Sequence, residues 1–189
     1  MYNQGMARLE QPVRTATSFE EFLEFERSSP VRHEFIDGNL FVMAGGTDRH
    51  NQLAIRVLTR ASLAVEGYGC LVYMADMLVR TPFGVGYYPD VFASREAVDG
   101  SRVKFQPCFI AEVLSESTEA IDRGEKLLNY AQFDGLETYV LISQVTPQAE
   151  VYSRQPDGSW RYEVIKSAGV LRVPCIKLDL PLEILYANL

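Results

Sequence analysis

The stretch Cys108-Phe109-Ile110-Ala111-Glu112-Val113-Leu114 is the most apolar run of the chain, and a single carboxylate interrupts it. Its length and composition predict a buried β-strand. Because side chains alternate between the two faces of a strand, Glu112 shares a face with Ile110 and Leu114. A carboxylate among apolar neighbours is costly unless a partner satisfies it. This position therefore predicts either a structural ion pair or a functional acid.

A second acid interrupts the expected strand over residues 87–93, in the stretch Tyr88-Pro89-Asp90-Val91-Phe92. Alternation places Asp90 on the face of Tyr88 and Phe92. Neighbouring carboxylates raise each other's pKa, and a divalent cation removes that repulsion. Hard oxygen ligands suit Mg²⁺ or Mn²⁺. For either acid alone, a buried ion pair with an arginine is the open alternative.

The surrounding pattern predicts a mixed α/β domain with one central sheet and helices on its faces. Ser18 can cap a helix that ends near Pro30, Asp37-Gly38 predicts a hairpin turn, and Thr47 can cap a long helix. Thr118 can cap a further helix that runs to about Phe133. Residues 1–17 lack periodicity and predict a flexible N-terminal arm before a single domain over residues 18–189.

Charge limits the partners of this chain. Its 189 residues include 18 Lys and Arg against 25 Asp and Glu, a formal net charge of −7. An acidic chain needs a local basic patch or a metal ion to bind nucleic acid. The best candidate patch joins an expected helix face to a polar loop: Arg49, Arg56, Arg60, Arg95, Arg102 and Lys104. For each residue alone, a solvated charged face is the alternative.

Cysteine usage and hydropathy predict the compartment. No apolar run approaches the ~18 residues of a membrane span, and the polar stretch from Met1 to Pro12 has no signal-peptide core. Cys70, Cys108 and Cys175 are far apart and flanked by apolar residues. They predict reduced core cysteines in a cytoplasmic protein with no membrane partner, and no disulfide framework or zinc site.

Five motifs and a terminal Leu180-Pro181-Leu182 follow one another in an order that is specific as a set, although a lone Pro-Asp is not. The motifs are Arg32-His33-Glu34-Phe35-Ile36-Asp37-Gly38, Asp48-Arg49-His50-Asn51, Tyr88-Pro89-Asp90-Val91, Ala111-Glu112-Val113-Leu114-Ser115-Glu116-Ser117-Thr118 and Asp122-Arg123-Gly124-Glu125-Lys126. In this order they resemble the PD-(D/E)XK nuclease superfamily, and more specifically the bacterial Uma-type family of restriction-endonuclease-like proteins. The resemblance covers nearly the whole chain.

The resemblance implies a restriction-endonuclease-like α/β fold, with a mixed central sheet flanked by helices. It implies a Mg²⁺ or Mn²⁺ ion between Asp90 and Glu112, with the backbone carbonyl of Val113 as a further ligand. It also implies that an acid from the N-terminal part, here Glu34, completes the site. A solvent-facing position in the hairpin is the alternative for Glu34.

The chain departs from the superfamily at the lysine. That lysine usually lies two residues after the second acid, where Leu114 stands here. Lys126 on the following helix is the candidate for a relocated catalytic lysine. An i, i+4 pair with Asp122 on an exposed helix is the alternative, and both roles can coexist.

Three further residues are weaker candidates for the site. His50, near the start of the second helix, suits a surface position or a place beside the acids better than the role of a base. Tyr130 could hydrogen-bond into the site, but core packing explains it equally well. Asp76 lies between two strand pieces and suits a bulge.

The leading functional hypothesis is a metal-dependent endonuclease that hydrolyses DNA phosphodiester bonds, expected to act as a homodimer. The first alternative is a non-catalytic nucleic-acid- or protein-binding module on the same fold. The net negative charge and Leu114 at the usual lysine position favour this alternative. The second alternative, a structural dimerisation protein, rests on the aromatic hairpins near the C-terminus.

Overall fold

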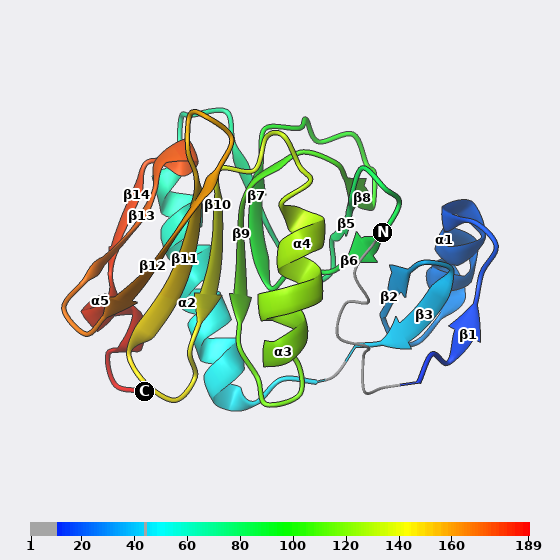
Figure 1. Cartoon of the computed structure of the whole chain (residues 1–189), viewed down its shortest axis with the longest axis horizontal. Coiled ribbons are helices and arrows are strands. Elements are labelled where there is room, and N and C mark those ends of the chain that lie inside the picture. The colour runs from blue at the N-terminus through cyan, green and yellow to red at the C-terminus, as the bar shows by residue number, and fades with distance from the viewer. Residues whose placement is uncertain (1–10, 44) are drawn as a thin grey trace.

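A mixed six-stranded sheet forms the centre of the molecule. The computed structural model describes residues 11–43 and 45–189, and Figure 1 shows their arrangement. The strand order is β12-β11-β10-β9-β7-β4, in which β9 and β10 are parallel and the other pairs antiparallel. The bounds are β4 (Leu71–Met74), β7 (Val91–Ser94), β9 (Pro107–Val113), β10 (Thr138–Ile142), β11 (Gln148–Arg154) and β12 (Trp160–Lys166). The expected mixed α/β fold is confirmed.

Alternation along β9 separates two hydrophobic clusters. Phe109, Ala111 and Val113 pack with the buried face of α2 (Asp48–Ala64). Ile110 and Leu114 pack in a different cluster, with aromatic residues from the opposite helical layer. In Figure 1, α2 lies behind the sheet and α3 and α4 lie in front of it. Glu112 therefore points toward the α3–α4 side, as the alternation predicts.

The helix in front of the sheet differs from the expected single α-helix. It consists of α3 (Glu119–Ile121), the π-helical turn η1 (Asp122–Lys126) and α4 (Leu127–Tyr130). Thr118 precedes it but makes no side-chain capping hydrogen bond. A π-helical turn widens the spiral by one residue, and such turns are frequent at functional sites. Here the turn buries both Asp122 and Lys126.

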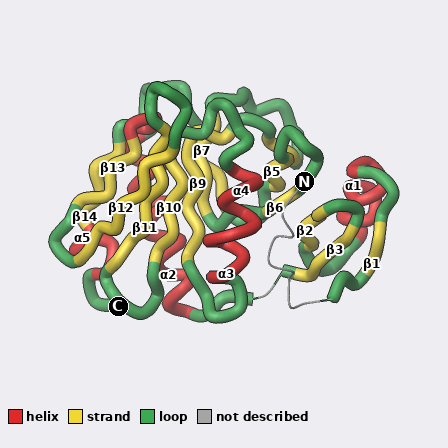
Figure 2. The backbone as a smooth tube through the Cα atoms, viewed as in Figure 1, coloured by secondary structure: helices red, strands yellow, loops and turns green. Residues whose placement is uncertain are grey.

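A second six-stranded sheet lies beside the central one, although a single sheet was expected. Its order is β1-β3-β2-β6-β5-β8. The bounds are β1 (Arg14–Thr15), β2 (His33–Ile36), β3 (Asn39–Val42), β5 (Leu78–Arg80), β6 (Gly86–Tyr87) and β8 (Val103–Lys104). Helix α1 (Phe19–Ser28) packs with this sheet, and Figure 2 shows both at one end of the molecule.

The local signals of this region act as the sequence predicts. The side chain of Ser18 accepts a hydrogen bond from Glu21 N and caps α1. Asp37 and Gly38 join β2 to β3 with φ of 48° and 82°, the positive values that a type I′ hairpin turn requires. The expected flexible arm differs, because Arg14 and Thr15 pair with β3. The first ten residues of that arm lie outside the described residues.

The C-terminal part packs against α2 and the same face of the central sheet. It comprises β13 (Val170–Val173), η2 (Pro174–Ile176), β14 (Leu178–Pro181) and α5 (Leu182–Tyr186). The expectation of three reduced cysteines is wrong, because Cys108 of β9 and Cys175 of η2 form a disulfide. Cys70 is free and buried. None of the helices in the described residues has the length and apolarity that a membrane crossing requires.

Candidate active site

The expected strand over residues 87–93 is broken in two, and the break positions the first acid. Strand β6 ends at Tyr87 and β7 begins at Val91, so Pro89, which has no backbone N–H to donate, and Asp90 lie between them. Asp90 N donates to Glu112 Oε2 at 3.1 Å, and Val113 N donates to Asp90 Oδ2 at 2.8 Å. The Glu112 carboxylate thus binds the backbone N–H of Asp90, and the Asp90 carboxylate binds the N–H of the residue after Glu112. These two hydrogen bonds hold the acids together.

Lys126 joins three of the acids. Its Nζ lies 3.0 Å from Glu112 Oε1, 3.1 Å from Asp122 Oδ1 and 3.4 Å from Glu34 Oε1. The i, i+4 pair with Asp122 exists, but the helix face is buried, because Lys126 is 6% and Asp122 1% exposed. Glu34 is 7% exposed, so a solvent-facing hairpin position is wrong for it.

Acidic side chains outnumber basic ones in this cluster. Four carboxylates, those of Glu34, Asp90, Glu112 and Asp122, line one cavity with the single ammonium of Lys126. Asp122 Oδ1 is buried and lies at ion-pair distance from that ammonium. It forms no hydrogen bond to any group in the described residues. Neither Asp90 nor Glu112 pairs with an arginine in the described part of the chain; Glu112 instead pairs with Lys126, and Asp90 with His50.

The pKa values reflect this crowding. Burial raises the pKa of Glu112 to about 8, Lys126 opposes the shift, and the charges of Asp90 and Asp122 add to it. Burial alone would lower the pKa of Lys126, but the carboxylates of Asp122, Glu112 and Glu34 outweigh burial and hold it well above its ordinary value. Lys126 is therefore charged, while Glu112 retains its proton more strongly than an exposed glutamate.

His50 stands beside Asp90. His50 Nε2 lies 3.1 Å from Asp90 Oδ2. This hydrogen bond raises the pKa of the imidazole, and burial opposes it. Gly46 makes room for the ring, since a Cβ there would lie 2.9 Å from His50 Nδ1. The structure thus places His50 next to the first acid.

The structure brings Tyr130 into the site but leaves Asp76 outside it. Tyr130 OH donates to Glu112 Oε1 at 3.0 Å, and the side chain is fully buried, so it packs in the core and reaches the site. Asp76 lies away from the acids in the turn after β4, where its 85% exposed side chain pairs with Arg32 at 3.5 Å.

Three of the six residues in the expected basic patch stabilise the fold. Arg49 Nε donates to Gln144 O, and Arg56 donates to the carbonyls of Leu185 and Ala187. Lys104 is buried and donates to Ala97 O. These cations are held by their own chain, so they do not form a free surface for DNA together with Arg60, Arg95 and Arg102.

A buried hydrogen-bond network around Glu26, which the sequence does not predict, adjoins the site. Glu26 Oε1 accepts from His33 N at 2.9 Å and from Tyr88 OH at 3.1 Å, and Glu26 Oε2 lies 2.9 Å from His33 Nδ1. It connects α1 with the residue before Glu34 and with the segment that leads to Asp90. The burial of Glu26 was predictable, because Glu26 shares a helix face with the apolar Phe19 and Phe22.

The cavity suits a small hydrated cation by donor chemistry. It has a volume of about 90 Å³, and Val113 lines it beside the acids. Asp90 Oδ1 has no protein partner in the described part of the chain, and the side chain is 18% exposed. Across residues 11–43 and 45–189, no three His, Cys, Asp or Glu side chains are grouped to hold a metal ion by themselves.

Comparison with known proteins places the chain in a family. Residues 19–183 match the model of the Uma2 family, described as putative restriction endonuclease. An uncharacterized protein of Synechocystis sp., slr1290, is 30% identical over 173 residues, which cover 90% of this chain and 91% of that protein. A second Synechocystis protein, sll1609, is 30% identical over 145 residues and 74% of this chain, and 82% of its own length is covered.

A solved structure shows the same fold. The crystal structure of a putative nuclease belonging to DUF820 from Anabaena variabilis superposes with a TM-score of 0.74. The match covers 91% of this chain and 98% of that one at 16% sequence identity. With the family match over residues 19–183, the conclusion is that this chain belongs to the Uma2 family of putative restriction endonucleases.

Proposed function

We propose that this protein is a metal-dependent endonuclease that hydrolyses DNA phosphodiester bonds. The observation that carries the proposal is the reciprocal pairing of Asp90 and Glu112 beside the buried ammonium of Lys126. Two further carboxylates, those of Glu34 and Asp122, line the same small cavity, and such a cluster exceeds what a structural ion pair needs. Membership of a family described as putative restriction endonuclease supports the same activity.

Asp90, Glu112 and the carbonyl oxygen of Val113 are the proposed ligands of Mg²⁺ or Mn²⁺. They fit such an ion because they are hard oxygen donors, and because the acids that line the cavity outnumber the lysine. Two acidic side chains leave room in the coordination sphere for the backbone carbonyl and for substrate oxygen. When bound, the ion supplies Lewis acidity at the scissile phosphate.

The chain's own residues supply positioning and charge. The Lys126 ammonium can donate to a phosphate oxygen or to the attacking water, and it stabilises the negative charge that develops on the phosphate. Glu34 and Asp122 both lie at ion-pair distance from that ammonium and hold it in place. Tyr130 fixes the Glu112 carboxylate through its hydroxyl. Glu34 thereby completes the proposed catalytic set.

The first test is DNA cleavage with Mg²⁺ or Mn²⁺ by the wild type and by Asp90→Asn and Glu112→Gln. We expect each substitution to lower the rate by about 10²-fold or more, as for other losses of transition-state charge stabilisation. Asp179→Asn is the matched control, because Asp179 is an acid on β14 with a side chain 74% exposed. Cleavage that survives both site substitutions would reject the proposal.

The second candidate function, a non-catalytic binding module, is separated by metal binding. An ion that binds the folded state at 100 times its Kd stabilises it by about 2.7 kcal/mol. For a chain of this size, that raises Tm by roughly 5–10 °C. The enzyme hypothesis predicts this rise with Mn²⁺ for the wild type and its loss in Asp90→Asn. A binding module without a metal site shows no rise in either protein.

We also propose a homodimer, since paired subunits related by a two-fold axis suit the cleavage of two DNA strands. The edge strand β12 supports this proposal, because Tyr162 and Val164 are 52% and 39% exposed on it. Light scattering coupled to size-exclusion chromatography measures the mass directly, and a monomer at all concentrations contradicts the proposal.

A further inference from the structure

We propose that a second cavity beside the acidic one binds an unpaired nucleotide of the DNA strand, next to the phosphate that is cleaved. This inference rests on the proposed function and names how the substrate is held. The cavity has a volume of about 490 Å³, within the range of ligand pockets. We call it the arginine cavity, after Arg27 of α1, Arg32 before β2 and Arg102 before β8.

The three guanidinium groups are available to a phosphate. Arg102 makes no side-chain hydrogen bond or ion pair within the described part of the chain. Arg32 Nε lies 3.5 Å from Asp76 Oδ1, and Arg27 Nη1 lies 2.6 Å from Glu24 Oε2. Both acidic partners are strongly exposed, at 85% and 74%, and exposed ion pairs contribute little stability. An incoming phosphate can therefore replace them at small cost.

Glu26, the buried acid that lines the arginine cavity, does not repel an anion strongly. Glu26 is 5% exposed, and its two oxygens already accept hydrogen bonds from His33 and Tyr88. Its charge is thus directed toward donors inside the fold. The arginines stand at the more open side, where Arg27 and Arg102 are exposed.

The walls of the arginine cavity suit a nucleobase. Leu23, Leu78 and Val103 are apolar, and Tyr88 adds an aromatic ring with the Arg32 guanidinium 6.0 Å from its centroid. Unpaired bases stack on aromatic rings and on guanidinium planes in single-strand-binding proteins. A base inside a duplex is stacked and paired, so it cannot enter such a cavity without leaving the helix.

Tyr88 lines both cavities, so the two are neighbours. Asp90 follows two residues later. Two residues of extended chain span at most about 7 Å. A nucleotide in the arginine cavity therefore lies close along the strand to a phosphate at Asp90.

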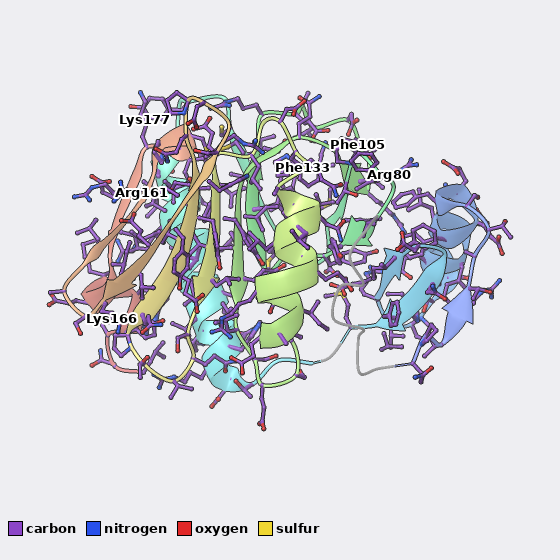
Figure 3. The ribbon with its side chains drawn as sticks, viewed as in Figure 1. Arg80, Phe105, Phe133, Arg161, Lys166 and Lys177 are labelled. Carbon is purple, nitrogen blue, oxygen red and sulfur yellow. A yellow bond between two sulfur atoms is a disulfide. The ribbon has the colours of Figure 1, made fainter. Side chains whose placement is uncertain are left out.

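The test is the binding of a fluorescent 12-nucleotide single strand, measured by anisotropy in EDTA. The test variant is the double substitution Arg27→Gln and Arg102→Gln. The matched control is Arg161→Gln with Arg172→Gln, which removes two exposed arginines that also pair with exposed acids. Figure 3 shows Arg161 on the opposite side of the molecule from α1. Thermal unfolding checks that both variants fold.

We expect the test variant to bind the strand about tenfold more weakly and to show a shallower salt dependence, with a slope reduced by about 1–1.5 for two lost phosphate contacts. The control binds within about twofold of the wild type. An abasic site moved along the strand weakens wild-type binding most at one position, by about tenfold when one stacked base is lost. That positional effect disappears in the test variant.

Three results would overturn the inference. They are equal binding by the test variant and the control, an equal loss of affinity for a blunt duplex and for the single strand, and an abasic scan without a preferred position. Because binding is measured without a divalent ion, the outcome is independent of cleavage. Loss of cleavage in every assay rejects the proposed function and leaves this binding result standing, while cleavage with unchanged strand binding in the test variant rejects the nucleotide site alone.

Discussion

At the residue scale, Lys126 determines whether the acidic cluster can be buried at all. Glu34, Glu112 and Asp122 each lie within 3.4 Å of its ammonium, and all three are less than 10% exposed. A buried charge that loses its partner is strongly destabilising, because nothing replaces the water that burial removed. The same ammonium that serves the proposed chemistry is therefore a structural requirement.

Replacing Lys126 with methionine keeps the length of the side chain and removes its charge. We expect Lys126→Met to lower the free energy of unfolding by about 3–5 kcal/mol, since the carboxylates around it lose their buried partner. Urea denaturation at neutral pH measures the change. Lys166→Met is the control, because Lys166 is exposed at the end of β12 (Figure 3), and we expect a change within about 0.5 kcal/mol. Equal stabilities of the two variants would show that the cluster does not depend on Lys126.

The raised pKa of Glu112 predicts a pH dependence of stability in the absence of divalent ions. The folded carboxyl ionises near pH 8 instead of 4.5, so between these values the folded state holds a proton that the unfolded state has released. Stability due to this group therefore falls as pH rises across that window. Thermal unfolding in EDTA from pH 5 to pH 8 measures it.

Glu112→Gln isolates this contribution. His50 also has a raised pKa, and its contribution is lost as pH rises through its folded pKa, in the same direction as that of Glu112. Because glutamine does not titrate, the difference between the wild type and the variant at each pH belongs to Glu112. The Tm of the variant should fall less with pH, and parallel curves would contradict the assigned pKa.

At the element scale, the β2–β3 hairpin brings Glu34 to the site and the π-helical turn brings Lys126. Glu34 is on β2, whose register with β3 is set by the Asp37-Gly38 turn. Lys126 ends the π-helical turn η1 that starts at Asp122. A one-residue slip in the hairpin would turn Glu34 to the other face of the sheet. Both elements therefore need unusual backbone geometry at a defined residue.

Gly38→Ala tests the hairpin. Gly38 has φ of +82°, and a Cβ there would lie 3.3 Å from Ala16 O, so alanine is strained in this turn. We expect the free energy of unfolding to fall by about 1–2 kcal/mol. Gly135→Ala is the matched control, since a Cβ there meets no atom closer than 3.9 Å. A stability loss that is no larger for Gly38→Ala than for the control would contradict the argument.

The sequence predicted the elements that carry local signals and missed those that do not. Ser18, Thr47 and Asp37-Gly38 form caps and a turn with their immediate neighbours, so their effect is readable from a few residues. Strand β8 has two residues, too few to show a period, and it lies in a stretch that the sequence predicts as a polar loop. The π-helical turn is invisible for a related reason, because one additional residue in a helix leaves its apolar pattern almost unchanged.

The acids of the site were predictable because they violate a pattern. Glu112 stands alone among apolar residues of a buried strand, and such an exception needs a physical cause. Lys126 was found through the family resemblance, and its pairing with Asp122 through their spacing. The arginine cavity was not predictable, since Arg27, Arg32 and Arg102 come from three segments that only the second sheet brings together.

At the scale of the whole molecule, the site lies where two sheets and a helical layer meet. Glu34 belongs to the second sheet, Glu112 to the central sheet, and Lys126 to the layer in front of it, while Asp90 lies on the segment that joins the sheets. No single element contains the site. Its geometry therefore depends on the packing of the entire fold, and global stabilisation from elsewhere in the chain supports it.

The disulfide between Cys108 and Cys175 is such a distant source of stability. It joins positions 67 residues apart, and a cross-link over a loop of this length stabilises a fold by about 4 kcal/mol in the chain-entropy model. We expect Cys175→Ser to lower the free energy of unfolding by up to this amount. Cys108 lies near the start of β9 and Glu112 near its end, so Mn²⁺ binding by the folded variant should be unchanged. Alkylation of the denatured wild type provides a direct check. One thiol, that of Cys70, should react before reduction and three after it, whereas three reactive thiols without reduction would show that the cysteines are reduced.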